Sequence, residues 1–129
     1  ACTHLANKIS NRLHEWLERV SSNEEPSDSI VAFNIGLFEI EDGEYSVYLI
    51  GAIAFDESNE DWACSEAFSP SERYCILPDV AGYEWSVVLD LLAEAVKEFI
   101  DSIPGRSSFI GSARAVTVGF DSGELVRVK

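Results

Sequence analysis

The chain has 129 residues, the length of one ordinary domain, and 47% of them are hydrophobic, which excludes a disordered acidic tail although the formal net charge is −14. No apolar run approaches the roughly 20 residues of a membrane span, the N-terminus lacks a signal-peptide pattern, and the absence of an initiator Met suggests a processed or trimmed start. Three cysteines without CxxC spacing fit a reducing compartment, so we expect a single cytoplasmic domain over residues 1–129.

An amphipathic helix is predicted at the N-terminus. Its apolar residues recur at intervals of three and four, which places them on one face of a helix: Leu5, Ile9, Leu13, Trp16, Leu17 and Val20. Thr3 is the expected N-cap. Residues 21–29 are expected to form a linker after the helix.

A β-hairpin is predicted next. Two β-branched and aromatic runs, residues 30–40 and 45–55, flank Asp42-Gly43, and this dipeptide is typical of a tight turn with positive φ at both central residues. With this turn, Phe38 lies opposite Val47. In that register both faces of the hairpin are apolar, so we expect a helix or a partner to cover the second face.

A polar segment over residues 56–69 is expected to form a long ordered loop. Ser69-Pro70-Ser71-Glu72 matches a capping box with proline at the first helical position, which indicates a short helical turn. Residues 73–77 predict a short third strand that ends at Pro78.

A second long helix is predicted over residues 85–103, ended by Pro104-Gly105. A second hairpin follows, with strands over residues 113–120 and 124–128 and a turn at Asp121-Ser122-Gly123. This order predicts an α+β domain in which an antiparallel sheet of four to five strands, built from two hairpins, packs with two long helices.

Acidic residues are concentrated in the middle of the chain. Between Arg19 and Arg73 there is no Lys or Arg, whereas thirteen of the 23 acidic residues fall there. Their mutual repulsion destabilises the free fold, and a cationic partner relieves it. We therefore expect the hairpin tip and the following loop to bind such a partner through acidic residues and two neighbouring aromatic anchors: Glu41, Asp42, Glu44, Asp56, Glu57, Glu60, Asp61, Glu66, Trp62 and Phe68.

Other readings of these residues stay open. A run of carboxylates is also typical of a solvated face that keeps a protein dispersed. Trp62 is equally compatible with a side chain folded back into the core. Direct binding of nucleic acid is disfavoured because the net charge repels a phosphate backbone, whereas a basic nucleic-acid-binding protein is attracted.

No catalytic motif is recognisable in the sequence. The two histidines both fall in the first predicted helix, and a serine elbow, a phosphate-binding glycine loop and zinc spacings are all missing. Asp56, Ser58 and Glu60 imitate the first ligands of a calcium loop, but Asp61 stands at the sixth position, where that loop has Gly. We therefore expect neither enzymatic activity nor a metal or other cofactor.

Two stretches carry a resemblance to a known class of proteins. One is Asp61-Trp62-Ala63-Cys64-Ser65-Glu66 followed by Phe68-Ser69-Pro70, and the other runs from Val118 to Val126 as VGFDSGELV. With these stretches the chain resembles the small immunity proteins of bacterial toxin–immunity systems, including contact-dependent growth inhibition. The resemblance implies a cytoplasmic inhibitor that binds one cognate toxin, commonly a basic nuclease, and blocks its active site or an adjoining surface.

A second hypothesis comes from the apolar character of the predicted sheet. A structural subunit or adaptor that oligomerises through an apolar sheet face also fits the pattern, whereas an immunity protein is expected to be a monomer. An enzyme or metal-dependent sensor is the third hypothesis, and the missing motifs disfavour it.

Overall fold

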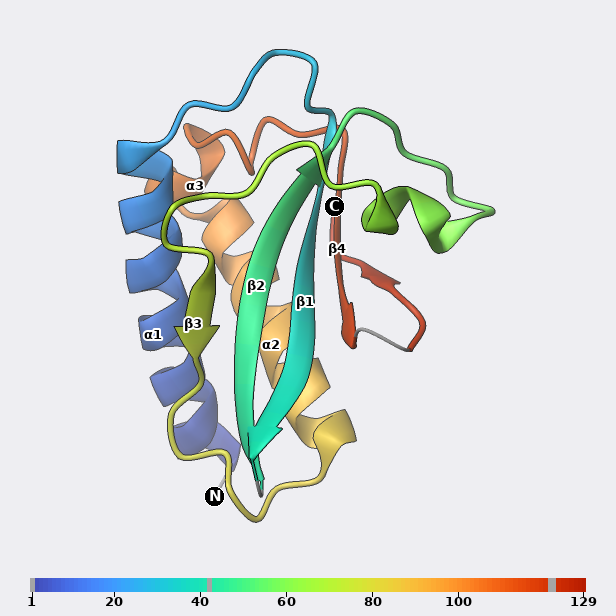
Figure 1. Ribbon diagram of the computed structural model, residues 1–129. Coiled ribbons are helices and arrows are strands. Elements are labelled where there is room, and N and C mark those ends of the chain that lie inside the picture. Colours follow the sequence, from blue (N-terminus) through green and yellow to red (C-terminus); the bar gives the residue numbers. More distant parts are fainter. Residues whose placement is uncertain (1, 42, 121–122) are drawn as a thin grey trace.

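The computed structural model describes residues 2–41, 43–120 and 123–129 and has the predicted α+β architecture (Figure 1). The helices are α1 (Cys2–Asn23), the 3-10 helix η1 (Glu60–Cys64), α2 (Trp85–Asp101) and α3 (Ile103–Arg106). The strands are β1 (Ala32–Glu41), β2 (Glu44–Ala52), β3 (Tyr74–Ile76), β4 (Ala115–Phe120) and β5 (Val126–Arg127). The paired strands of the two predicted hairpins, the short third strand and the two long helices are thereby confirmed, whereas Asp121 and Ser122 of the second predicted turn lie outside the described residues.

The five strands form one sheet in the order β3-β2-β1-β4-β5. The predicted antiparallel pairing holds within both hairpins and between β2 and β3. The pair that joins the two hairpins, β1 with β4, is parallel. A parallel neighbour needs a crossover connection, and the segment that contains α2 provides it.

The register of the first hairpin differs from the prediction by one residue. Glu41 lies opposite Glu44 as expected, but a bulge between Glu39 and Glu41 shifts every pair further into the sheet, so that Leu37, and not Phe38, lies opposite Val47. A one-residue shift moves every side chain of a strand to the other face. Here it places Ile35 opposite Leu49 and Leu37 opposite Val47 on one face, because burying that face outweighs a local irregularity.

The core lies between this face and the two long helices, and α2 is seen behind the sheet in Figure 1. Both helices present an apolar stripe with a helical period to the same face, as their sequences predict. The largest fully buried side chains of this core come mostly from these three elements: Ile9, Leu13, Trp16 and Leu17 of α1, Leu92 and Phe99 of α2, Phe33, Ile35, Leu37 and Leu49 of the sheet, and Ile110 before β4.

The helix ends differ in detail from the prediction. Because α1 begins at Cys2, Thr3 lies within its first turn and is not the N-cap. The second long helix ends at Asp101 instead of continuing to Ile103, which is 84% exposed. Proline clashes with the carbonyl four residues earlier in a helix, so Pro104 opens the separate turn α3, whose N-cap Ser102 accepts a hydrogen bond from the N–H of Gly105 at 3.1 Å.

The segment between β2 and β3 contains one helix that was predicted as loop and lacks a turn that was predicted. The 3-10 helix η1 forms where the side chain of Asn59 accepts the N–H of Asp61 at 3.0 Å and caps it. No helical turn forms over residues 69–72. The preceding residue, Phe68, pairs instead with Gly51 at the end of β2, and residues 71 and 72 form a bend.

Candidate functional site

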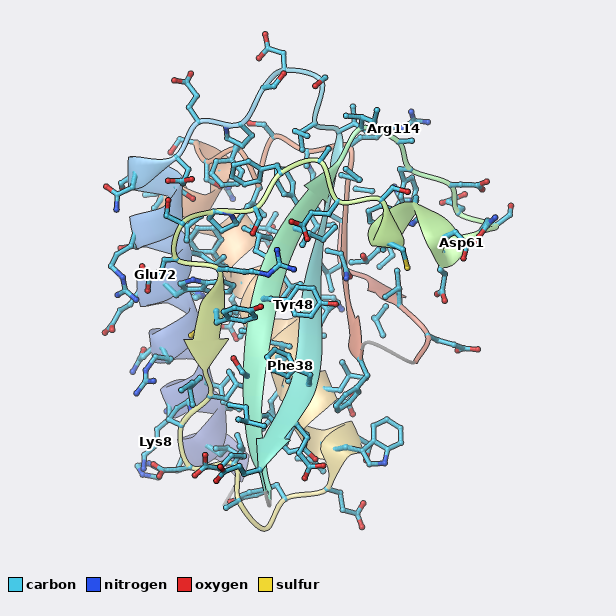
Figure 2. All side chains as sticks on the ribbon, viewed as in Figure 1. Lys8, Phe38, Tyr48, Asp61, Glu72 and Arg114 are labelled. Carbon is cyan, nitrogen blue, oxygen red and sulfur yellow. The ribbon has the colours of Figure 1, made fainter. Side chains whose placement is uncertain are left out.

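One face of the sheet is turned away from α1 and α2, and we call it the open face. At one end of it, side chains from the segment between β2 and β3 form a small second core in which Trp62 packs on Ala32, Ala52 and Ala115. The other end has no such cover, and Figure 2 shows Phe38 and Tyr48 on it. The prediction that a helix or a partner covers the second face is therefore met in part by the chain itself.

The uncovered part of the open face carries an aromatic cluster. A Cβ added to Gly36 would lie 2.1 Å from Cζ of Tyr48, so the tyrosine ring lies directly across the glycine of the neighbouring strand. The ring centroid of Phe38 is 6.0 Å from that of Tyr48 and 5.8 Å from that of Tyr74. Only glycine leaves room for this arrangement, which makes Gly36 the base of the cluster.

Two guanidinium groups of the chain lie against aromatic rings on this face. Arg73 lies 5.5 Å from the ring of Tyr48 and 5.6 Å from that of Tyr74, and it pairs with Glu66 at 2.8 Å. The open face thus holds a planar cation between rings and a carboxylate.

The second guanidinium repeats this arrangement at the far edge of the sheet. Arg127 lies 4.9 Å from the ring of Phe55 and pairs with Glu57. A guanidinium group that contacts an aromatic ring and pairs with a carboxylate is therefore found at both ends of the segment that carries η1.

A groove runs between η1 and the open face, and we call it the η1 groove. It consists of two adjoining hollows of about 410 and 230 Å³ that share Tyr48, Ala63 and Cys64. Acidic side chains of the η1 segment line one side, and residues of β1, β2 and β3 line the other: Glu60, Asp61 and Glu66 face Asn34, Phe38, Tyr48 and Tyr74. A concave surface with aromatic and acidic walls can hold a cationic group together with an apolar stem.

The structure divides the predicted binding residues into two groups. Glu41 and Glu44 lie at the hairpin tip, at the opposite end of the sheet from η1 (Figure 1). Asp42 lies outside the described residues. The hairpin tip and the loop therefore do not form one acidic patch, and only the loop borders the η1 groove.

Most carboxylates of the loop already have partners within the chain. Asp56 accepts the N–H of Ser58, Glu57 pairs with Arg127, Glu60 accepts the N–H of Leu125, and Glu66 pairs with Arg73. Asp61 is exposed, and its carboxylate has no hydrogen bond or ion pair within the described part of the chain. Asp61 is consequently the loop carboxylate that is available to a cationic ligand.

The two aromatic residues predicted as binding anchors are internal. Trp62 is 7% exposed, and its ring meets that of Phe55 edge to face at a centroid distance of 5.2 Å. Phe68 is half-buried and contacts the rings of Phe33 and Phe109. Of the two interpretations of Trp62, the structure shows the one in which the side chain is folded back into the core. There the indole anchors η1 to the sheet.

The residues that form the sheet side of the groove were missed from the sequence. The sequence pattern predicts Tyr48 and Tyr74 only as strand residues. Asn34 was also passed over, although a polar residue inside an otherwise apolar strand is a usable signal because a buried amide needs partners.

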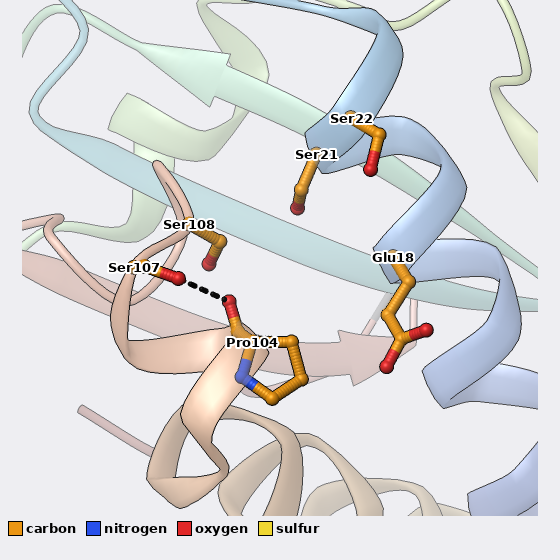
Figure 3. Close-up of a pocket in the computed structure, with 6 residues that line it drawn as sticks. All are labelled: Glu18, Ser21, Ser22, Pro104, Ser107 and Ser108. Carbon is orange, nitrogen blue, oxygen red and sulfur yellow. Dashed lines mark hydrogen bonds between the residues drawn. The ribbon is translucent and has the colours of Figure 1, made fainter.

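A separate hollow of about 290 Å³ lies between the C-terminal end of α1 and α3 and is lined mainly by serines (Figure 3). The hydroxyl of Ser107 donates to the carbonyl of Pro104 at 3.3 Å, and that of Ser108 donates to the carbonyl of Gly105 at 2.6 Å. These hydroxyls close the α3 turn. Glu18, the one acidic residue of the lining, hydrogen-bonds to none of these serines among the described residues, so no serine is paired with a base and we assign this hollow no chemistry.

The cysteine thiols and the possible metal ligands bear on nucleophilic and metal chemistry. Cys64 is exposed, whereas burial raises the pKa of Cys75 to about 11, so the Cys75 thiol stays protonated at neutral pH. Across residues 2–41, 43–120 and 123–129, no three His, Cys, Asp or Glu side chains are grouped so as to hold a metal ion. No helix among these residues has the length and apolar character needed to cross a bilayer.

Comparison with known proteins found no matching family model, no matching curated protein and no matching solved structure. The function is therefore argued from the geometry of the chain itself.

Proposed function

We propose that this chain is an immunity-type inhibitor, a non-enzymatic cytoplasmic protein that binds a cationic toxin domain through η1 and the η1 groove. The observation that supports this most directly is Asp61, an exposed carboxylate without a partner among the described residues, above a groove with aromatic walls. A toxin that acts on nucleic acid carries a basic surface, and Asp61 with its acidic neighbours complements such a surface.

The η1 segment is held in place before any partner arrives. Trp62 anchors it to the sheet from below, and Glu60 Oε2 accepts a hydrogen bond from the N–H of Leu125 at 2.8 Å. A preorganised surface loses less conformational entropy on binding than a mobile loop does. The arrangement therefore favours tight binding of one partner.

The net charge of −14 favours a cationic partner over a second copy of the chain. Opposite charges accelerate association, up to about 10⁸ to 10⁹ per molar per second at low salt, and like charges repel. Two copies that met through this face would bring their acidic η1 segments together.

A structural subunit or adaptor is the second candidate, and it has one observation in its favour. Tyr74 and Ile76 on the open face are 54% and 55% exposed, and Ile40 beside the bulge is 44% exposed. Sedimentation of the purified chain in low and high salt tests this candidate. A salt-insensitive oligomer supports it, whereas a monomer supports the inhibitor.

The test of the inhibitor uses the protein encoded by the adjacent gene, purified with and without this chain. We expect a stable complex and loss of the toxin's activity within it. Asp61→Lys is expected to slow association by roughly tenfold at low salt, because the change turns attraction into repulsion at the contact.

Glu44→Lys is the matched control. It alters the net charge of the chain by the same amount, but Glu44 lies at the hairpin tip, away from η1. We expect less than about a twofold effect on association. Equal slowing by both variants would mean that only total charge matters, and no slowing by either would refute η1 as the contact.

A further inference from the structure

We propose that the η1 groove receives an extended segment of the cationic partner, whose backbone carbonyl accepts a hydrogen bond from the side-chain amide of Asn34 while an adjacent Lys or Arg side chain pairs with Asp61. This inference rests on the function proposed above and specifies what enters the site. It assigns Asn34, which sequence analysis overlooked, as a binding residue.

Asn34 is a largely buried residue whose side-chain amide keeps one donor for the groove. The residue is 4% exposed, and its Oδ1 accepts the hydroxyl of Thr117 at 2.8 Å. Within the described residues, its Nδ2 has no hydrogen-bond partner. Among the described residues, Ser21 Oγ is the one buried side-chain nitrogen or oxygen without a partner, so Nδ2 of Asn34 keeps contact with solvent at the groove. A ligand carbonyl can replace water at this donor.

The position of Asn34 directs this donor to the groove. Asn34 belongs to β1 and projects on the open face, and it lines the smaller hollow together with Tyr48, Glu60 and Asp61. A ligand that enters between η1 and the sheet can therefore offer this donor an acceptor in place of water.

The walls of the groove restrict what that acceptor is. An anionic acceptor is repelled by Glu60 and Asp61, which line the same hollow. A neutral carbonyl oxygen is not repelled, and every residue of a peptide carries one. An extended segment also carries alternate side chains to opposite sides, so a basic side chain next to the bound carbonyl can reach Asp61.

Within the chain itself, one basic side chain already lies between aromatic rings and a carboxylate. Arg73 combines the rings of Tyr48 and Tyr74 with the carboxylate of Glu66 in the adjoining hollow. A basic side chain of the partner would meet the same kind of surroundings at Tyr48 and Asp61.

The first experiment follows the side-chain amide resonance of Asn34 by NMR during titration with capped peptides. The probes are Gly-Arg-Gly-Arg-Gly and, as a charge control, Gly-Glu-Gly-Glu-Gly. We expect the basic peptide to shift the Asn34 side-chain resonance together with the backbone amides of Asp61 and Cys64, and the acidic peptide to shift none of them. A basic peptide that moves only the Asp61 region, or that does not bind at millimolar concentration, overturns the inference.

The second experiment measures affinity with a variant that leaves no orphaned group. Asn34→Ala combined with Thr117→Val removes both members of the buried pair, and we expect it to weaken binding of the basic peptide and of the toxin by about fivefold. Ser46→Ala is the matched control, because Ser46 is also a buried polar residue on the open face but does not line the groove. It is expected to leave both affinities unchanged.

The two proposals fail in different ways. If the Asn34 variant keeps full affinity for the toxin while Asp61→Lys slows its association, the groove is not entered and the inhibitor function stands. If the toxin binds but neither variant affects its binding, both the surface and its occupant are wrong.

Discussion

At the scale of single residues, the site depends on a glycine. Gly36 and Tyr48 are partners across β1 and β2, and the tyrosine ring occupies the space where any other residue at position 36 would place its Cβ. This contact fixes the ring at the boundary between the two hollows of the η1 groove.

Gly36→Ala is therefore expected to displace the ring of Tyr48 and to destabilise the fold by about 1–3 kcal/mol, the usual range for overpacking. Urea denaturation measures this free energy of unfolding. In a Tyr48→Ala background, Gly36→Ala is expected to lower the free energy of unfolding by clearly less, because the ring atoms that clash with the new Cβ have been removed. Equal costs in both backgrounds would show that the ring does not cause the effect.

The residue-scale prediction from the sequence succeeded for the core and failed for the site. The buried stripe of α1 and the buried side of each strand follow from periodicity, which is a local property. The roles of Asn34 and Tyr48 depend on the bulge between Glu39 and Glu41, which local patterns do not reveal. Trp62 was placed correctly only as one of two alternatives.

At the scale of elements, α1 covers the outer edge of the sheet. The indole N–H of Trp16 donates to the carbonyl of Glu72 at 2.7 Å, and Arg12 donates to the carbonyl of Ile76 at 2.9 Å. The hydrogen bond from Arg19 lowers the pKa of Glu72 and ties the same stretch to the helix. The carbonyl of Ile76 at the end of the edge strand β3 and that of Glu72 before it are thus occupied by α1, which limits pairing with other chains there.

Trp16→Phe is expected to lower the free energy of unfolding by about 1–3 kcal/mol, since it leaves the Glu72 carbonyl without its donor and a gap in the core. Chemical denaturation followed by circular dichroism measures it. Trp85→Phe makes the same chemical change at a side chain that is 58% exposed, and we expect a change within about 0.5 kcal/mol. Comparable losses in both variants would argue against the role of this hydrogen bond.

The elements themselves were largely predictable, whereas their assembly was not. Both long helices, both hairpins and β3 follow from apolar period and turn residues. The parallel pairing of β1 with β4 and the formation of η1 depend on contacts between distant segments, which a single sequence does not encode in any short window.

At the scale of the whole molecule, the charge is only partly balanced within the fold. Five ion pairs are present among the described residues, against 23 acidic residues in the sequence. Surface ion pairs contribute little to stability, while the remaining carboxylates repel one another over longer distances.

Added salt is therefore expected to stabilise the protein. Screening shortens the Debye length from about 30 Å at 0.01 M to about 8 Å at 0.15 M, which weakens the repulsion more than it weakens close pairs. We expect the melting temperature to rise by a few degrees over this range, equally in NaCl and KCl. A fall in melting temperature would indicate that the ion pairs matter more than the excess charge, and a difference between the salts would indicate specific ion binding.

The parallel pair β1–β4 also has a consequence for the order of events during synthesis. Asn34 and Thr117, which hydrogen-bond to each other across this pair, are 83 residues apart in the chain. On the ribosome one edge of the central strand stays unpaired until β4 has emerged, because contacts of long sequence separation form late. A nascent chain thus presents the first hairpin and η1 well before their neighbouring strand arrives. If the chain is the proposed inhibitor, it would therefore become able to bind its partner only when translation has passed β4.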